Sequence, residues 1–192
     1  LCYVHCEAYD PAHPQSPIFL PLGLEAAQSN LCYSIIQNAR MGEDSAELSV
    51  RHVRARFDPN DFQGPSFGLA TAIADRSARY GFSAAWANRQ VIATGEIIKG
   101  GQGEVGAIDG FAAKVRLLER EAPAGSLFVF PSANLETASA ETLQALKRAE
   151  ERGTFSWRAV DHLRQLEDLF AGPAAELRLA AKGVASAREA ST

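Results

Sequence analysis

The sequence has few cysteines, no excess of positive charge and no long apolar run. Its three cysteines, Cys2, Cys6 and Cys32, are an odd and sparse set that argues against a disulfide framework and for a reducing compartment. Nineteen basic against 23 acidic residues give a net charge of -4, which offers no bulk attraction to nucleic acid or to an anionic membrane. We therefore expect a cytoplasmic protein that binds neither nucleic acid nor membrane.

Membrane-spanning and targeting segments are also missing. The longest apolar runs, such as 127–130, fall far below the roughly 20 residues of a membrane span, and no signal peptide opens the chain. A chain of 192 residues that is 46% apolar can bury one sizeable core, so we expect a soluble protein with one main domain. Because the first residue is Leu1 rather than Met, we expect a trimmed sequence or a piece of a larger polypeptide.

No metal site is predicted. Cys2, His5 and Cys6 lack a downstream Cys/His pair that would complete a tetrahedral site. Cys2 and Cys6 are instead expected on one face of a strand, as small buried hydrophobic residues. A histidine-based triad is not predicted either, because none of the four histidines stands in a motif with a serine or a cysteine.

No nucleotide or other cofactor is predicted. The pattern Gly101-x-Gly103-x-x-Gly106 formally matches the dinucleotide fingerprint, but the acidic residues that follow, Glu119 and Glu121, fall at the end of a predicted helix rather than of a strand. The chain also contains no G-x-x-x-x-G-K-[ST] sequence, so no ATP-binding motor is predicted within it.

Helical and extended segments alternate along the chain, which indicates a mixed α/β (α+β) fold with helices packed on a mixed sheet. We predict extended segments at 1–8, 18–22, 48–57, 91–98 and 127–130, and helices at 24–39, 66–80, 109–119, 141–152 and 159–170. The first helix should bury a face made of Leu24, Ala27, Leu31, Ile35 and Ala39. A change of phase in the apolar residues of 48–57 suggests a bulge near His52. The expected organisation is an extended segment 1–16, a domain 17–171 and a tail 172–192.

A serine stands at the start of the helix predicted at 66–80, after the loop 58–65. In Gln63-Gly64-Pro65-Ser66-Phe67-Gly68, the residues before Ser66 favour a turn, and the glycines allow another backbone to approach. The N–H groups and the positive dipole end of a helix start can stabilise the oxyanion that forms when a serine attacks a carbonyl. The alternative is that Ser66 only caps the N-terminus of the helix and has no catalytic role.

Three motifs together resemble the proteolytic domain of Lon proteases: Gly64-Pro65-Ser66-x-Gly68, Thr94-Gly95-Glu96-Ile97, and Gly103-x-Val105-x-x-Ile108-x-Gly110-x-x-x-Lys114. The resemblance is strongest from Asp58 to Asn134 and extends over about Pro17–Ala171. It implies a serine endopeptidase in which Ser66 is the nucleophile, Lys114 is the general base and Thr94 lies close to the lysine. Gly64, Pro65 and Phe67 would support the nucleophile and the oxyanion.

Two positions depart from the commoner Lon pattern. Gln63 replaces an acidic residue three places before the serine, and Phe67 replaces a small residue after it. These departures leave open a non-enzymatic binding or assembly module. A domain that cleaves only its own chain is a further alternative, with which the internal start at Leu1 is compatible. The expected partner is an unstructured polypeptide substrate cut without ATP or any cofactor. A fused or separate ATPase or sensor domain, and a homo-oligomer, also stay open.

The resemblance asks a lysine to act as a base. A free lysine has a pKa of about 10.4 and becomes a base at neutral pH only when its surroundings favour the neutral amine. In 110–118, Phe111, Val115 and Leu118 are at helical spacing around Lys114, and no carboxylate stands four residues either side of it. The sequence therefore predicts an apolar setting for this amine, against the alternative of an ordinary exposed lysine.

Overall fold

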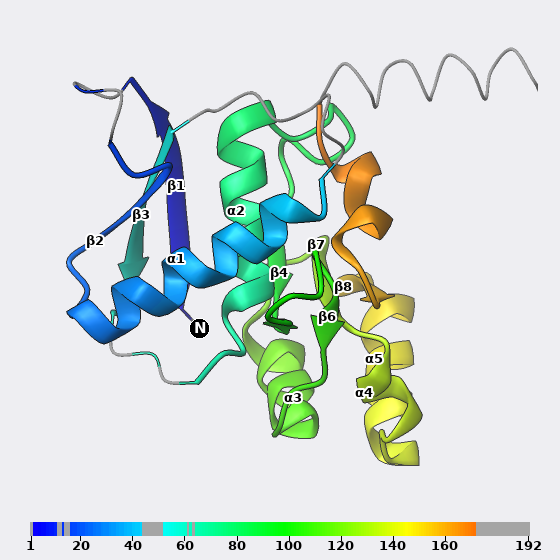
Figure 1. Cartoon of the computed structure of the whole chain (residues 1–192). Helices are drawn as coiled ribbons and strands as arrows, with labels where there is room; N and C mark the ends of the chain where they lie inside the picture. The colour runs from blue at the N-terminus through cyan, green and yellow to red at the C-terminus, as the bar shows by residue number, and fades with distance from the viewer. Residues whose placement is uncertain are drawn as a thin grey trace, which may run out of the picture.

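The computed structural model describes residues 2–10, 13, 16–43, 52–60, 62 and 64–171. Within them the chain is a mixed α/β protein whose helices lie among three small sheets rather than on one (Figure 1). The prediction of a mixed fold is confirmed. The predicted tail 172–192 lies outside the described residues.

The first sheet has the strand order β1-β3-β2. β1 (Tyr3–Tyr9) runs antiparallel to β3 (His52–Asp58), and β2 (Phe19–Leu22) runs parallel to it. In β3, Val53, Ala55 and Phe57 are buried and alternate with exposed residues, which is the pattern of a strand with one face on a core. The pairing of β1 with β3 runs from Tyr9–His52 to Tyr3–Asp58 without interruption. The predicted bulge depended on Leu48 and Val50, which lie outside the described residues.

The second sheet is parallel, with the order β4-β7-β8. Its strands are β4 (Val91–Ala93), β7 (Ser126–Pro131) and β8 (Phe155–Val160). Every residue of β7 is buried, as expected for the central strand of a parallel sheet. Leu127 and Val129 join one hydrophobic cluster, and Phe128 and Phe130 join another, because successive side chains point to opposite faces. The sheet therefore separates two cores.

The first core lies under α1 (Ala26–Met41) and α2 (Gly68–Tyr80). In α1 the buried apolar residues are Cys32, Ile35, Ile36 and Ala39, whereas Leu31 is exposed. The predicted face was therefore wrong at Ala27 and Leu31, which point away from the core. α2 ends at Gly81, as predicted, and Gly81 takes a φ of 76°, in the region where glycine is favoured.

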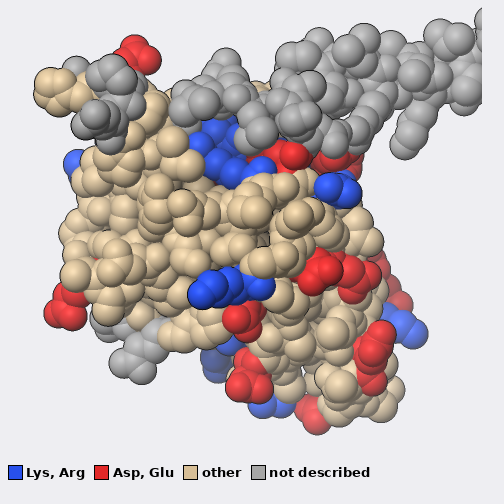
Figure 2. All heavy atoms as spheres, viewed as in Figure 1, with Lys and Arg blue, Asp and Glu red and all other residues tan. Residues whose placement is uncertain are grey.

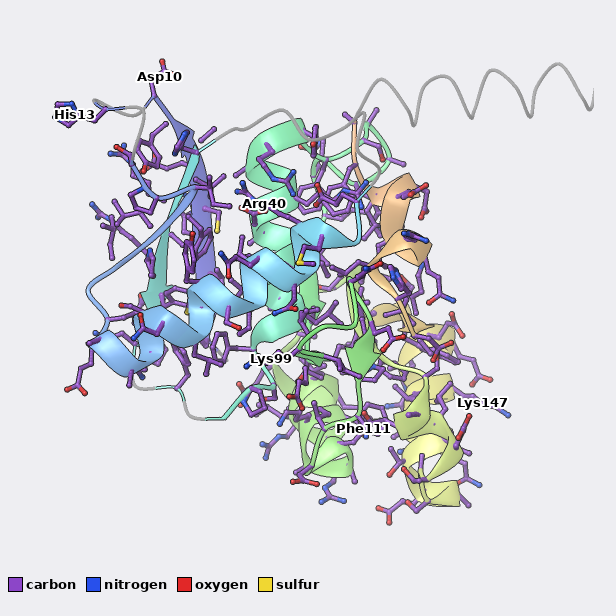
Figure 3. The ribbon with its side chains drawn as sticks, viewed as in Figure 1. Asp10, His13, Arg40, Lys99, Phe111 and Lys147 are labelled. Atoms are coloured by element: carbon purple, nitrogen blue, oxygen red, sulfur yellow. The ribbon has the colours of Figure 1, made fainter. Side chains whose placement is uncertain are left out.

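The second core is covered by α3 (Phe111–Glu121) and α5 (Ala140–Glu151), with the short α4 (Ala133–Glu136) beside β7. Phe111 opens α3 (Figure 3) and packs on Phe128 and Phe130, with ring centroids 6.3 and 4.8 Å apart. Both helices were predicted within two residues of their bounds. Charged side chains gather over this part of the molecule, whereas the face over α1 is mostly uncharged (Figure 2).

The strand predicted at 91–98 is broken into two. β4 ends at Ala93, and β5 (Glu96–Ile97) pairs antiparallel with β6 (Val105–Gly106) in a separate hairpin. The break falls at Thr94 and Gly95. The backbone N–H of Gly95 donates to Ser66 instead of continuing the ladder.

The helix predicted at 159–170 was also wrong. Ala159 and Val160 belong to β8, and the chain then forms a 3-10 helix, η2 (Leu163–Leu169). Leu163, Leu166 and Leu169 are buried, and their spacing of three residues suits a 3-10 helix, which has 3.0 residues per turn.

A buried ionic cluster joins α1 to α2. Arg40, at the end of α1 (Figure 3), donates to Asp75 at 2.6 Å, and Arg79 donates to Asp75 at 3.0 Å and to Glu43. Burial alone would lower the pKa of Arg79, but the hydrogen bond to Glu43 and the charge of Asp75 raise it above its ordinary value. Removing one partner from such a cluster typically costs about 3–5 kcal/mol. The cluster fixes the orientation of α2, and hence of the segment that leads into it.

Candidate active site

One cavity of about 490 Å³ brings together Ser66, Thr94 and Lys114. Its walls come from β1, α2, β4 and α3, together with Phe128 of β7. Ser66 and Lys114 are half-buried, and Thr94 is buried. Residues from three distant parts of the sequence therefore meet in one hollow between the two sheets.

Ser66 lies in the turn that precedes α2. The helix begins at Gly68, and its N-cap position is Phe67, so Ser66 is not the N-cap. The Ser66 hydroxyl donates to none of the described residues, and it lines the cavity. The alternative that Ser66 is only the N-cap of this helix is therefore excluded.

The backbone carbonyl of Ser66 is held from the other side of the cavity. It accepts hydrogen bonds from the Gly95 N–H at 2.8 Å and from the Thr94 hydroxyl at 3.2 Å. In return, the Leu69 N–H donates to the Gly95 carbonyl at 2.9 Å. These three bonds fasten the turn carrying Ser66 to the segment that follows β4.

Glycine is required where these two segments meet. A Cβ on Gly95 would lie 3.0 Å from Val105 Cγ1 and 3.1 Å from Leu69 Cβ, and a Cβ on Gly68 would lie 3.1 Å from the Ile97 nitrogen. At distances this short the neighbouring atoms would have to move by a few tenths of an ångström to admit a methyl group. Both glycines belong to the motifs of the Lon resemblance, and their physical role is to allow this close approach.

Phe67 anchors the turn in the first core. Its ring lies 4.3 Å from Phe62 and 6.2 Å from Phe57, measured between centroids. Gly64 takes a φ of 72°, and both Gly64 and Pro65 are exposed. The bulky residue after the serine therefore packs in the core and also lines the cavity beside Ser66. Gln63 lies outside the described residues.

Lys114 stands in the first turn of α3. Its Nζ donates to the Asp109 carbonyl at 3.5 Å, and within the described residues no hydrogen bond joins it to Ser66. Phe111, Val115 and Leu118 of the same helix are buried in the second core, so the apolar setting predicted for this lysine is present on one side. Leu117 and Leu118 line the cavity beside the amine.

The helix start supplies fewer open donors than the sequence suggested. The Gly68 N–H donates to Pro65, the Leu69 N–H to Gly95 and the Thr71 N–H to Phe67. The N–H groups of Ser66 and Phe67 donate to none of the described residues. An oxyanion beside Ser66 would thus meet the two N–H groups of the turn and the positive end of the α2 dipole.

β4 is an edge strand of its sheet, and sequence reasoning did not find that it lines the cavity. Leu127 donates to the Gln90 carbonyl and the Thr94 N–H donates to Val129, so Gln90, Ile92 and Thr94 direct their backbone groups to β7. Val91 and Ala93 direct theirs to the open edge, and both residues line the cavity. No sequence signal distinguishes an edge strand from a central one when the strand has only three residues.

The three cysteines are free thiols. Cys2 is exposed rather than buried as predicted, because it precedes β1, and its Sγ lies 3.3 Å from the Pro59 carbonyl. Burial raises the pKa of Cys6 above its ordinary value and that of Cys32 to about 12. In the described part of the chain no three His, Cys, Asp or Glu side chains are grouped as metal ligands, and no helix there is long and apolar enough to cross a membrane.

No family model matches the chain, and no curated protein matches it. The candidate site therefore rests on its own geometry.

Proposed function

We propose that the chain is a serine endopeptidase of the Lon type that cuts unstructured polypeptides with a dyad of Ser66 and Lys114. The observation that carries the proposal is the single cavity lined by Ser66, Thr94 and Lys114. Supporting it are the unengaged hydroxyl of Ser66, the two open N–H groups beside it and the dense packing of the Lon-like motifs around Gly68 and Gly95.

The proposed reaction assigns a role to each of these residues. Neutral Lys114 Nζ accepts the Ser66 proton as Oγ attacks the substrate carbonyl, and the oxyanion is held by the N–H groups of Ser66 and Phe67. The leaving amine takes the proton from Lys114, and the acyl-enzyme forms. Lys114 then takes a proton from water as the water oxygen attacks the ester, and it returns this proton to Ser66 Oγ when the C–O bond of the ester breaks. For the first step Nζ has to leave the Asp109 carbonyl, and its long, weak bond of 3.5 Å makes that change cheap.

The open edge of β4 offers a place for the substrate backbone. An extended chain beside β4 can pair with the backbone groups of Val91 and Ala93, which brings its carbonyl toward Thr94 and Ser66. A folded protein cannot present such a strand, so the proposed substrates are unstructured. We also propose that the protein works in a reducing compartment such as the cytoplasm, where its three free thiols persist.

A covalent trap tests the proposal directly. An activated ester of a short apolar peptide should acylate Ser66, and acid quenching followed by mass spectrometry should find the acyl group on the peptide that contains Ser66. The Ser66→Ala variant should stay unmodified. An adduct on another residue, or none in a folded sample, would contradict the proposed nucleophile.

The second candidate is a module that binds peptides in the cavity without cutting them. The bond from Lys114 to the Asp109 carbonyl, away from Ser66, favours it. Peptide binding by the wild-type chain, combined with no acylation and no cleavage between pH 7 and 10, would establish this candidate instead.

A further inference from the structure

The described residues that line the cavity include two basic side chains, Lys114 and Arg89, and no carboxylate. Arg89 keeps its positive charge when Lys114 is neutral, as the proposed reaction requires. The chain as a whole has a net charge of -4, so the cavity differs in charge from the rest of the molecule. A bound segment that carries negative charge is favoured by this arrangement.

Arg89 stands at the opposite end of β4 from Ser66. It comes two residues before the strand, whereas Ser66 contacts Thr94 and Gly95, directly after it. The three residues of β4 span about 10 Å, at about 3.3 Å per residue. We consider a peptide that has its scissile carbonyl at Ser66 and its backbone along β4. In this peptide, the third to fifth residue from the scissile bond lies beside Arg89.

The guanidinium of Arg89 is held in place but keeps donors to offer. Its Nε donates to the Gly125 carbonyl at 3.0 Å, and its Cζ lies 4.7 Å from the centroid of the Trp86 ring. Neither η nitrogen donates to any of the described residues. Two N–H groups on a fixed plane suit a carboxylate, which accepts both at once.

Between these two ends most of the cavity wall is apolar, with Ser77 and Gln90 as polar members. The apolar side chains from α2, β4, α3 and β7 that line it include Ala70, Ile73, Ala74, Val91, Leu117 and Phe128. Polar or charged substrate residues there would lose water without gaining a partner. The wall therefore selects apolar residues next to the scissile bond.

We infer that the cavity selects an extended segment with apolar residues beside the scissile bond and a carboxylate at its third to fifth residue, bound by the η nitrogens of Arg89. Arg89 is then a specificity-determining residue. The inference rests on the proposed function for the position of the scissile bond, but binding of such a segment does not require that the chain cut it. The carboxylate comes either from an acidic side chain or from the end of a chain.

The test uses uncharged ten-residue peptides of Ala, Val and Leu with amidated ends and a fluorophore. One Glu, Gln or Lys is placed at each position from the second to the sixth residue on either side of the central bond. A further set has no charged side chain but ends in a carboxylate at the same distances. Binding to the Ser66→Ala variant is measured by fluorescence anisotropy, and cleavage by the wild type is measured as kcat/KM.

Arg89→Gln removes the proposed contact, and Arg116→Gln is its matched control. Arg116 is exposed on α3, does not line the cavity and carries the same charge. Arg89→Lys keeps the charge without the planar pair of donors. The unfolding midpoint of each variant shows whether the change has disturbed the fold.

Glu should be preferred over Gln by about fivefold at one position from the third to the fifth, the effect of one partly exposed ion pair. The preference should vanish in Arg89→Gln, persist in Arg116→Gln and be partly kept in Arg89→Lys. A preference only for peptides with a terminal carboxylate would assign the site to chain ends. Equal binding of Glu and Gln peptides, or a preference unchanged by Arg89→Gln in a folded sample, overturns the inference. Binding with an Arg89-dependent preference but without cleavage keeps the inference and removes the proposed hydrolysis.

Discussion

Thr94 donates its hydroxyl proton to the backbone carbonyl of Ser66 at 3.2 Å. The bond links the residue that follows β4 to the turn that precedes α2, and the Gly95 N–H binds the same carbonyl at 2.8 Å. Thr94 thereby holds the turn that carries Ser66 through the backbone carbonyl of Ser66. The sequence resemblance placed Thr94 near the lysine, and the structure gives its hydroxyl a partner at Ser66.

Replacing Thr94 by Val should slow the reaction without abolishing it. Valine keeps the shape but cannot donate, so the Ser66 carbonyl loses one of its two bonds and the turn gains freedom. We expect kcat to fall about tenfold with KM little changed, and stability to fall by about 1 kcal/mol. Steady-state kinetics and thermal unfolding measure the two effects. Thr94→Ser, which restores the hydroxyl, should recover most of kcat, and failure of this rescue would leave Thr94 a purely structural role.

Ser66→Ala should remove peptidase activity while the fold persists. The change deletes one oxygen that donates to none of the described residues, so the free energy of unfolding should change by less than about 1 kcal/mol. Loss of the nucleophile should lower kcat by at least about 1,000-fold. Ser77→Ala is the matched control, because Ser77 lines the same cavity but donates to the Ala74 carbonyl at 2.9 Å. Activity that survives in Ser66→Ala would remove Ser66 from the mechanism.

Lys114→Arg should also be inactive. Arginine keeps the positive charge and much of the length but cannot lose a proton, so it cannot serve as a general base. Lys147→Arg on α5 (Figure 3) provides the control, and it should leave the rate unchanged. Undiminished turnover in Lys114→Arg would exclude Lys114 as the base.

Most helices were predictable because their apolar spacing is local. α2, α3 and α5 carry such spacing and end at or near the predicted residues, as with Gly81 after α2. Two segments, 91–98 and 159–170, differ from the predicted secondary structure because of contacts with residues distant in the sequence. The chain at 91–98 leaves β7 only because Ser66 and Leu69 take the hydrogen-bonding groups of Gly95. Ala159 and Val160 are extended because β7 lies beside them.

The cavity shared by Ser66 and Lys114 could be anticipated only through the resemblance. The place of Arg89 in that cavity could be found only once the position of β4 at the edge of the sheet was known.

Acid should weaken the junction between η2 and the β5–β6 hairpin through His162. Its Nδ1 accepts from the Arg164 N–H at 3.0 Å, and burial, together with the charge of Arg164, lowers its pKa. The pKa of this histidine in the unfolded chain is about 6.5, so the unfolded chain binds the proton more readily than the folded chain. The stability present above about pH 6.5 is therefore lost as the pH falls through the lower pKa of the folded state. Thermal unfolding between pH 7.5 and 5 measures the loss. In His162→Asn the side-chain oxygen can still accept a hydrogen bond at the start of η2, but it does not titrate. The unfolding midpoint of this variant should therefore fall less steeply as the pH decreases. Equal pH dependence of the midpoint in the variant and the wild type would contradict this role of His162.

The state of the substrate should decide whether this chain can cut it. The proposed substrate is an extended segment beside β4, and the sequence contains no P-loop that could couple ATP to unfolding. A stably folded protein exposes such segments only through rare local opening, so it should resist cleavage, whereas the same protein held unfolded by reduction and alkylation should be cut slowly.

We would incubate one disulfide-bonded protein in native and in reduced, alkylated form, each with and without ATP, and follow new chain ends by mass spectrometry. Ser66→Ala is the control for contaminating proteases. Rapid ATP-stimulated destruction of the native form by this chain alone would contradict the expectation. Inertness toward the unfolded form, in a sample shown to be folded, would favour the peptide-binding module.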